Sequence, residues 1–352
     1  MTMEQPDNPQ LTLLESVARQ ALTHWGIENA YTIELVKHRE NAVYAVTRAD
    51  GMKTAMRVHR LGYHSDAALR SELQWIGALR DGGVTTPEVI PTVDGDLLAR
   101  VRIDEPCEEY QCDLLSWVDG VPLGSAEERS FSGDEAVRRT YLATGRLAAR
   151  IHNHSAAWTL PTGFERHSWD ADGCLGPGAL WGLYGDLEDL APEQLARFDE
   201  GAAHCLRVLE AFGKASDRYG LIHSDFVPDN LLDTGTDIVV LDFDDCGFGW
   251  HLWEIATAVF WHLGGESYSV ALGSFVEGYR EHRPLPDEHL ALLPTFLLLR
   301  GLVYLGWIHT RRETETAEQI LPFVLEETTR LCDELATESP SATREGVVRR
   351  RR

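Results

Sequence analysis

Three oxygen-bearing side chains stand in a pattern that suits the phosphorylation of a hydroxyl group. Asp225 and Asn230 interrupt the apolar run Leu221–Leu232, and Asp242 directly follows the next apolar run. Carboxylate and amide oxygens are the hard donors that Mg²⁺ prefers. Phosphoryl transfer to a hydroxyl needs one carboxylate to orient the acceptor and take its proton, while a second carboxylate and an amide oxygen hold the metal. The three residues therefore indicate magnesium-assisted phosphoryl transfer, since turn capping alone does not account for the whole set.

These side chains need a scaffold, and the N-terminal part of the chain predicts an antiparallel sheet with one inserted helix. An amphipathic helix from Leu14 to Trp25 comes first. Alternation of apolar and polar residues then predicts five strands, at residues 31–36, 42–47, 54–58, 97–103 and 111–118. Between the third and fourth strands, the sequence predicts a helix that begins at Ser65 or Asp66 and ends before Gly82.

After Gly120 the apolar residues recur mostly at helical spacing. The predicted helices span residues 133–153, 188–213, 251–263, 267–281, 287–309 and 315–336. The β signals in this half are Leu221–Leu232 and Asp237–Phe243. The most apolar stretch, Ala291–Ile308, contains Arg300 and predicts a helix buried in a large core rather than a membrane span.

Together these elements predict an α+β fold of two lobes. Residues 1–118 form a small lobe built on the antiparallel sheet, and residues 119–337 form a larger, mainly α-helical lobe. We expect a cleft at the junction of the lobes, because such junctions commonly bind ligands. The polar residues 1–10 and the basic tail 338–352 are expected to be disordered.

The charge of the chain argues against two classes of partner. Its 352 residues include 32 Lys and Arg against 56 Asp and Glu, which gives a formal net charge of −24. A surface of this sign opposes binding to nucleic acid and to anionic membranes, so we expect neither as a partner. Six scattered cysteines and the lack of a recognisable signal peptide predict a cytoplasmic protein. The sequence leaves the oligomeric state open.

The motif His-x-Asp-x4-Asn at residues 223–230, followed by Asp-Phe-Asp at residues 242–244, resembles the aminoglycoside phosphotransferase and choline kinase family. That family has the bilobal protein-kinase-like fold, and the resemblance extends over both lobes in order. It implies that Asp225 is the catalytic base and that Asn230 and Asp242 bind Mg²⁺. It also implies that ATP is the phosphoryl donor.

The same resemblance implies a set of nucleotide-binding residues in the small lobe. The family grips the phosphates with a lysine on the third strand, which pairs with a glutamate on the helix. Here Arg57 and Glu72 occupy those places, and arginine keeps the positive charge that binds the phosphates. Asn41 lies in the loop that would cover the phosphates, although this loop has no glycine. The backbone of Ser116 and Val118, in the segment between the lobes, would bond to the adenine edge.

Four further residues raise questions that the sequence leaves open. His223 opens the catalytic loop and is expected to support it rather than to react. Asp244 stands where protein kinases have a glycine, which favours a small-molecule kinase, and it would bind either metal or loop amides. Glu254 replaces the aspartate that is usual in the family, so the usual hydrogen bonding to the catalytic loop is in question. Arg300 is either a buried paired charge or a contact to the substrate.

The sequence thus predicts an ATP- and Mg²⁺-dependent phosphotransferase that acts on a hydroxyl of a small molecule. Acidic residues and tryptophans in the larger lobe suit an amine-bearing acceptor, such as an aminoglycoside, an amino alcohol or a homoserine-like compound. One alternative is a protein Ser/Thr kinase of the bacterial stress-response type, but no activation segment follows Asp242. The other is a nucleotide-binding pseudokinase, which the intact base and metal ligands disfavour.

Overall fold

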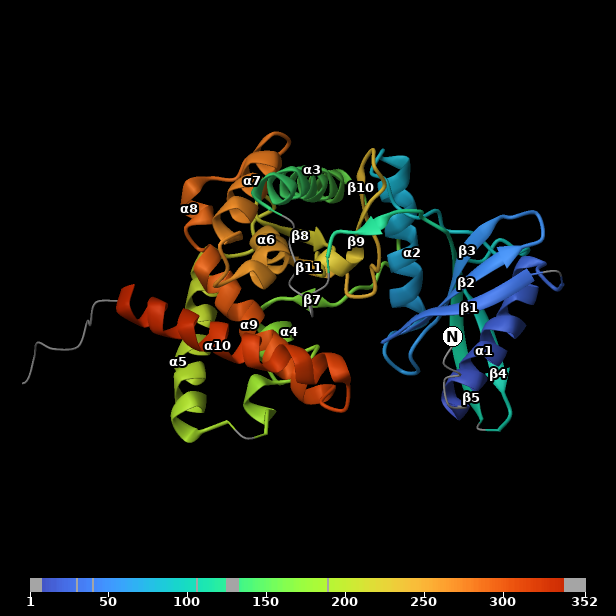
Figure 1. The fold of residues 1–352 in the computed structure, drawn as a ribbon, viewed down its shortest axis with the longest axis horizontal. Coiled ribbons are helices and arrows are strands. Elements are labelled where there is room, and N and C mark those ends of the chain that lie inside the picture. Colours follow the sequence, from blue (N-terminus) through green and yellow to red (C-terminus); the bar gives the residue numbers. More distant parts are fainter. Residues whose placement is uncertain are drawn as a thin grey trace, which may run out of the picture. The chain divides into compact units, whose positions relative to one another are not determined.

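The computed structural model describes residues 8–29, 31–39, 41–105, 107–124, 133–188 and 190–338. Its chain forms two compact units (Figure 1), and each unit draws on segments that are distant in sequence. Unit 1 contains the chain up to Leu123 together with Ala157–Arg166 and Asn230–Cys246. Unit 2 contains Gly124–Ala156, His167–Asp229 and the chain from Gly247 onward. Disorder is predicted for residues 1–10 and 338–352; of these, residues 1–7 and 339–352 lie outside the described residues, while Pro9, Gln10 and Glu338 are helical.

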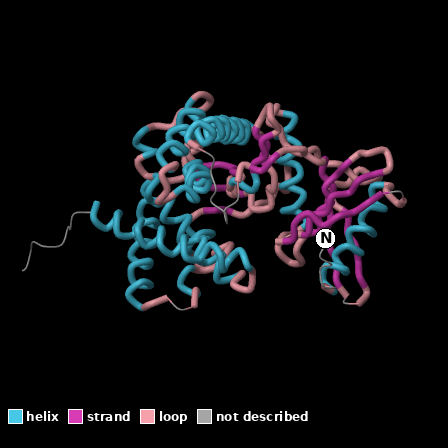
Figure 2. Tube along the Cα trace, in the orientation of Figure 1, coloured by secondary structure: helices cyan, strands magenta, loops and turns pink. Residues whose placement is uncertain are grey.

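Unit 1 is built on a five-stranded antiparallel sheet, which Figure 2 shows in magenta. The strands follow the order β1-β2-β3-β5-β4. Their bounds are Tyr31–His38 for β1, Ala42–Arg48 for β2, Lys53–Val58 for β3, Ala99–Ile103 for β4 and Glu108–Ser116 for β5. All five predicted strands are therefore present, because alternation of apolar and polar residues reports a sheet with one buried face.

Helix α1 (Pro9–Leu22) covers one face of this sheet and continues into the short 3₁₀ helix η1 (Thr23–Trp25). Asn8 caps α1, because its side chain accepts a hydrogen bond from the Gln10 N–H, and proline follows at the first helical position. The helix thus begins inside the segment that was expected to be unstructured. Its apolar face packs against sheet residues that include Tyr44, Val46 and Met56. Burial of each such side chain stabilises the fold by roughly 1.5–3 kcal/mol.

Helix α2 (Asp66–Asp81) begins where the sequence predicts it to begin. The Ser65 hydroxyl accepts a hydrogen bond from the Ala68 N–H at 3.1 Å and so caps the first turn. The helix ends at Asp81, directly before Gly82, as predicted. Its buried face carries Trp75, whose ring makes an edge-on contact with Phe243 at 5.4 Å between centroids. The helix therefore supports the segment that follows Asp242.

A second, three-stranded sheet in unit 1 has the order β10-β9-β6. Its strands are β6 (Val121–Pro122), β9 (Leu231–Asp233) and β10 (Ile238–Val240). Because β9 and β10 are antiparallel, the start of β9 lies beside the end of β10, where Leu231 pairs with Val240. The Leu241 N–H continues this ladder by donating to the Asn230 carbonyl oxygen at 2.8 Å. The hairpin therefore carries Asn230 and Asp242 at the same end.

Unit 2 is mainly helical and contains one small sheet, of order β7-β11-β8 (Figure 2). The sheet consists of β7 (Ser168–Trp169), β8 (Tyr219–Ile222) and β11 (Gly247–Trp250). The α-helices are α3 (Asp134–Ala157), α4 (Ala171–Leu175), α5 (Pro192–Phe212), α6 (His251–Val259), α7 (Tyr268–Arg280), α8 (Asp287–Leu290), α9 (Leu293–Thr310) and α10 (Glu315–Glu338). Short 3₁₀ helices are η2 (Tyr184–Asp186), η3 (Pro228–Asn230, at the boundary of the units) and η4 (Phe260–His262).

Interpretation of residues 221–232 as one apolar β run is wrong. Strand β8 ends at Ile222 and β9 begins at Leu231, and the residues between them form the loop that holds Asp225. The run is apolar because several residues of this loop are also buried, Phe226 among them. Hydrophobicity reports burial rather than strand geometry, so it does not reveal this break.

The apolar stretch predicted to be buried in the core, Ala291–Ile308, lies mostly in α9, and the predicted helix 287–309 is divided into α8 and α9. Residues Asp287–Thr310 are long and apolar enough to cross a membrane, with a mean hydropathy of 1.7, but 78% of the window is buried inside the protein. Helix α9 packs against α5, α6 and α10, which cover it on several sides. The stretch is therefore a core helix, as predicted.

Two glycines allow helices α3 and α7 to approach closely in unit 2. A Cβ atom on Gly145 would collide with the Phe275 carbonyl oxygen, and a Cβ on Gly278 would collide with the Leu142 carbonyl oxygen. Both obstacles are backbone atoms, which cannot move aside as a flexible side chain can. By contrast, a Cβ on the exposed Gly273, also on α7, would meet nothing within 4 Å.

We therefore expect opposite effects from two glycine-to-alanine changes in the same helix. Gly278→Ala lowers the free energy of unfolding by ~1–3 kcal/mol, because the added methyl group forces α3 and α7 apart. Gly273→Ala raises it by ~0.5–1 kcal/mol, because alanine is the better helix former. Urea denaturation measures both values, and equal effects of the two variants would contradict the close helix contact.

Candidate active site

The residue before Asp225 has a strained backbone. Ser224 and Asp242 have φ angles of 72° and 62°, and they are the two non-glycine residues with positive φ in the described part of the chain. This left-handed conformation costs a side-chain-bearing residue about 1–3 kcal/mol and persists only where neighbours enforce it. One angle lies inside the sequence motif, directly before Asp225, and the other is at the motif residue Asp242; strained geometry commonly serves a function at such sites.

In unit 2, the side chain of Glu254 enforces the conformation of Ser224. Its two carboxylate oxygens accept hydrogen bonds from the N–H groups of His223 and Ser224, each at 2.9 Å. The Trp253 indole N–H donates to the Ser224 hydroxyl at 2.9 Å. Glutamate in place of aspartate therefore still hydrogen-bonds to the loop that holds Asp225. Burial raises the pKa of Glu254, although His223 and the two N–H groups partly oppose that rise.

His223 is buried and supports the same loop. Its Nδ1 atom accepts a hydrogen bond from the Asp225 N–H at 3.2 Å, and its ring contacts Phe226 edge-on. His152, on α3, lies behind this region and contacts the Tyr279 hydroxyl at 2.8 Å. Burial lowers the pKa of His152 well below its usual value, so this ring is neutral at pH 7.

Asp225 is half-buried and has a cationic partner on α9. The Arg300 Nη2 atom lies 3.1 Å from Asp225 Oδ1. The Arg300 side chain is fully buried, whereas the Asp225 side chain keeps 22% of its surface exposed. Of the two roles that the sequence allowed for Arg300, the structure supports the buried paired charge.

In unit 1, Asn230 and Asp242 lie together at one end of the β9–β10 hairpin. Asn230 is buried, while the Asp242 side chain is 40% exposed and lies 3.8 Å from the Lys37 ammonium group. An amide and a carboxylate at the same end of a hairpin offer two hard oxygen donors, which fit Mg²⁺ when phosphate oxygens and water complete its coordination. Within the described residues, no group of three His, Cys, Asp or Glu side chains forms a metal site by itself.

Arg57 on β3 is buried between two carboxylates. Its Nη1 atom donates to Glu72 of α2 at 2.8 Å, and its Nη2 atom donates to Asp113 of β5 at 2.7 Å. The Nε atom also donates to Asp113, at 2.9 Å, so that this contact is two-pronged. The pairing of Arg57 with Glu72 is present as the family resemblance implies. The second carboxylate, Asp113, is an addition that sequence reasoning missed.

Asp113 also accepts a short contact from His59, whose Nε2 atom lies 2.6 Å from Oδ2. Burial by itself would raise the pKa of Asp113, but Arg57 and His59 outweigh it and lower the pKa from 3.8 to about 2. The carboxylate is therefore ionised at neutral pH. A buried ion network of this kind requires all of its members, because removal of one leaves an uncompensated charge.

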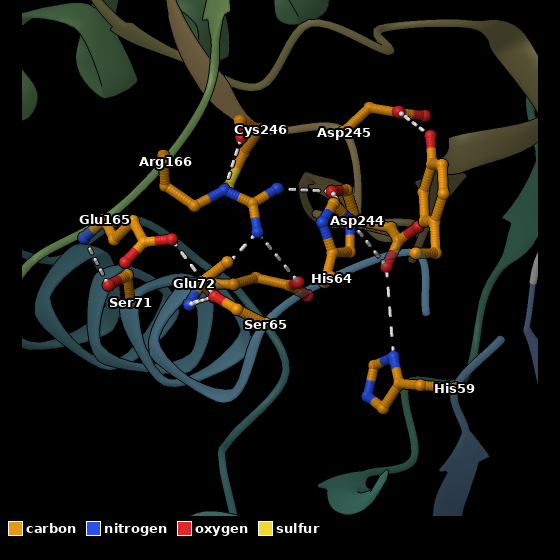
Figure 3. A network of polar contacts seen from close by, with 12 residues as sticks. His59, His64, Ser65, Ser71, Glu72, Glu165, Arg166, Asp244, Asp245 and Cys246 are labelled. Atoms are coloured by element: carbon orange, nitrogen blue, oxygen red, sulfur yellow. Dashed lines mark hydrogen bonds and ion pairs between the residues drawn. The ribbon is translucent and has the colours of Figure 1, made fainter. Parts of the chain in front are cut away.

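Asp244 belongs to the same buried region of unit 1, which Figure 3 shows from close by. Its carboxylate lies 3.6 Å from His64 and 3.9 Å from His59, and the His64 ring contacts the Asp244 carbonyl oxygen at 3.0 Å. Burial would raise the pKa of Asp244, but His64, His59 and Arg57 lower it. The Asp244 side chain thus faces histidines within the protein.

Arg166 ties helix α2 to the segment after Asp242 (Figure 3). Its Nε atom donates to the Cys246 carbonyl oxygen at 2.6 Å, and another nitrogen donates to the Asp244 carbonyl oxygen. A third contact reaches the Ala68 carbonyl oxygen on α2 at 3.2 Å. Arg166 also lies 3.8 Å from Glu72, which places the guanidinium groups of Arg57 and Arg166 on either side of that carboxylate. Because the partners are mostly backbone atoms, no sequence motif indicates this role.

The remaining predicted nucleotide-binding residues are also placed in unit 1. The Asn41 side-chain oxygen accepts a hydrogen bond from the Arg60 N–H at 3.1 Å, and its neighbour Glu40 lies outside the described residues. The Ser116 N–H donates to the Glu88 carbonyl oxygen at 2.8 Å, so this N–H already has a partner within the protein. Val118 follows Ser116 by two residues and is half-buried.

The structure therefore brings the predicted residues together in two groups. Asn230 and Asp242 lie together in unit 1, as do Arg57 and Glu72, and Asp225 lies in unit 2 with His223 and its supports. His59, Asp113 and Arg166 were missed. Only Asp113 left a signal, because a charged residue inside the otherwise apolar end of a predicted strand requires a buried partner.

Comparison with known proteins places this chain among small-molecule kinases. Residues 32–289 match the model of the phosphotransferase enzyme family, APH. An amicoumacin kinase from Bacillus subtilis (strain 168) is 22% identical over 86% of this chain and 87% of its own length. The structure of a microcompartment-associated aminopropanol kinase is 34% identical, with a TM-score of 0.81 over 92% of this chain and 98% of that one.

The structure of an amicoumacin kinase in complex with AMP-PNP, Ca²⁺ and Ami has the same fold. Its TM-score is 0.70 at 19% identity, over 95% of both chains. The predicted α+β class and protein-kinase-like fold are confirmed by these structural matches together with the observed five-stranded antiparallel sheet and helices.

The buried network in unit 1 generates a prediction about stability. Asp113→Asn removes the charge that faces Arg57 and His59, so we expect the free energy of unfolding at pH 7 to fall by ~3–5 kcal/mol. A carboxyl whose pKa is lowered on folding stabilises the protein above its unfolded pKa, and this contribution is lost as the pH falls from about 4 to about 2. The gap between wild type and variant should therefore narrow by ~1 kcal/mol between pH 7 and pH 3.

Urea denaturation at both pH values measures this gap. Asp50→Asn, at an exposed turn of the same unit, is the control and should change the free energy of unfolding by no more than ~0.5 kcal/mol. A gap that stays constant with pH would show that the Asp113 carboxylate is not held ionised by its partners.

Proposed function

The chain belongs to the phosphotransferase enzyme family, and we propose that it transfers the γ-phosphate of ATP to the hydroxyl of a small amino alcohol, with Mg²⁺ on the phosphates. The comparisons confirm two predictions made from the sequence: the chain belongs to this family, and it is a small-molecule kinase that phosphorylates a hydroxyl. The identity of the acceptor, the metal and the role of each residue are the proposed part.

The observation that carries the proposal is the strained loop around Asp225. Ser224 is held in a left-handed conformation by Glu254 and Trp253, and this conformation determines where the next residue, Asp225, presents its carboxylate. Enforced strain directly beside a half-exposed carboxylate is expected where that carboxylate must meet a reacting group. Asp242, the other strained residue, is a proposed metal ligand.

In the proposed reaction, Asp225 orients the acceptor hydroxyl and accepts its proton while the hydroxyl oxygen forms a bond to the γ-phosphorus. The bond between that phosphorus and the bridging oxygen breaks, and its electron pair leaves with ADP. Mg²⁺, held by Asn230 and Asp242, would neutralise charge on the phosphates. Arg57 would contact the phosphates, with Glu72 and Asp113 fixing the orientation of its guanidinium group.

One relative and the charge of the chain support an amine-bearing acceptor. Aminopropanol kinase, which is 34% identical over nearly its whole length, acts on a small amino alcohol by its name. The net charge of −24 also favours a cationic acceptor over an anionic one. We therefore rank amino alcohols first, ahead of aminoglycosides and homoserine-like acceptors.

The metal and the compartment belong to the same proposal. The two oxygen donors at the end of the β9–β10 hairpin suit Mg²⁺, and the structure of the related amicoumacin kinase is a complex with AMP-PNP and Ca²⁺, another hard cation. All six cysteines are free thiols, which fits the reducing cytoplasm.

A panel of acceptors tests the proposal directly. Purified protein with Mg-ATP should release ADP faster when an amino alcohol is added, and a phosphorylated alcohol should appear by mass spectrometry. Asp225→Asn should lower kcat by ~10²–10⁴-fold, because the amide cannot take the proton, while the Kd of Mg-ATP stays within about threefold. Phosphate appearing on a peptide rather than on any acceptor of the panel would contradict the proposed substrate class.

Asp242→Ala tests the metal site separately. Loss of this carboxylate should weaken Mg²⁺-dependent ATP binding by at least ~10-fold, as measured by calorimetry with and without Mg²⁺. Asp237→Ala is a matched control, since Asp237 is exposed at the opposite end of the same hairpin, and it should bind Mg-ATP as the wild type does. Equal Mg-ATP affinity of Asp242→Ala and wild type would refute the metal role.

A further inference from the structure

We propose that Arg300 is the positioning residue for Asp225, and that it orients the carboxylate from within the core without contacting the acceptor. This inference rests on the proposed function, in which Asp225 is the base. It gives a role to a residue whose charge has no other evident reason to lie inside the apolar helix α9, where all but a few side chains are buried.

The first argument is the set of atoms that the guanidinium group of Arg300 contacts. Its Nη2 atom donates to Asp225 Oδ1 at 3.1 Å and to the Tyr304 hydroxyl at 3.0 Å. Its Nη1 atom lies 3.5 Å from the carbonyl oxygen of Ser224, the strained residue. Arg300 therefore contacts both the carboxylate of Asp225 and the backbone immediately before it.

The second argument is the rigidity of Arg300 itself. Its guanidinium carbon lies 4.3 Å from the ring centroid of Tyr304, 4.8 Å from that of Trp181 and 5.0 Å from that of Trp253. Aromatic rings at these distances attract a cation and restrict a flat guanidinium group to few orientations. A side chain held in this way can impose an orientation on its partner.

The third argument is burial. The Arg300 side chain has no exposed surface, while that of Asp225 keeps 22%. A fully buried guanidinium group cannot be a contact for an acceptor that arrives from solvent, and it must act through the residue that does reach the surface. The Asp225 N–H is held separately by His223, so Arg300 fixes the side chain and His223 fixes the backbone.

If the ion pair between Arg300 and Asp225 only stabilised the fold, its removal would have different effects. Its loss would lower the melting temperature and would reduce kcat only in proportion to the unfolded fraction. A positioning residue instead changes kcat in the folded protein, because a displacement of about 1 Å in a catalytic group can lower the rate ~10²-fold. The binding of ATP and acceptor should then change little.

The experiment compares Arg300→Gln, Arg300→Lys and Tyr304→Phe in the full-length protein, each assayed well below its melting temperature. Arg300→Gln should lower kcat by ~10²-fold, with the KM of the acceptor and the Kd of Mg-ATP within about threefold of wild type. Arg300→Lys keeps the charge but not the fork, so it should recover part of that loss. Tyr304→Phe removes one hydroxyl that holds Arg300 and should lower kcat by only ~3–10-fold.

Arg146→Gln is the control, because Arg146 forms an exposed ion pair with Glu281 on the surface of unit 2 and should leave kcat unchanged. Crystal structures of wild type and Arg300→Gln provide a readout that does not depend on activity. They should show the Asp225 carboxylate in one orientation in the wild type and in a different or mixed orientation in the variant.

These measurements separate the two proposals. If the wild type phosphorylates no acceptor, the proposed function fails, and the crystallographic comparison still decides whether Arg300 orients Asp225. If the wild type is active but folded Arg300→Gln keeps its kcat, the positioning role is overturned. A change confined to the KM of the acceptor would also overturn it, since it would make Arg300 a binding contact. If Arg300→Gln does not fold, Arg300→Lys and Tyr304→Phe carry the test.

Discussion

The two hydrogen bonds from the Glu254 carboxylate to consecutive backbone N–H groups are the constraint on which the rest of the site depends. They hold Ser224 in a left-handed conformation that a serine does not adopt by itself. The strain is small compared with the free energy gained by satisfying a buried carboxylate with two donors. Because Asp225 is the next residue, its position follows from a contact made by a helix outside its own loop.

In unit 1, buried charged side chains likewise fix the geometry of the chain around them. Two guanidinium groups, of Arg57 and Arg166, flank the buried Glu72, and the carboxylate of Asp113 completes the pairing of Arg57. Burying ions is expensive, so a network like this contributes a defined geometry more than it contributes stability. Here the geometry joins β3, α2 and the segment after Asp242, which are the elements that the proposed nucleotide and metal sites share.

The sequence predicts most of the strands and helices correctly. Prediction fails where the pattern of apolar residues is not periodic. Strands with one buried face alternate visibly, and the Ser65 cap marks the start of α2. Strand β11, by contrast, contains two glycines and was not predicted, and the loop after Ile222 is as apolar as a strand because it is buried. The motif identified Asp225, Asn230 and Asp242, but the role of Arg166 was invisible, since its partners are backbone carbonyl groups that any residue supplies.

The aromatic residues around Arg300 bear on how an amine would be recognised. The guanidinium group of Arg300 lies over the rings of Trp181, Trp253 and Tyr304, which together form an aromatic enclosure. The cation in this enclosure therefore comes from the protein itself. Those ring surfaces are consequently closed to a substrate's ammonium group. For the proposed amine-bearing acceptor, other carboxylates or aromatic residues would have to select the amine, and redesign of acceptor choice should leave this enclosure intact.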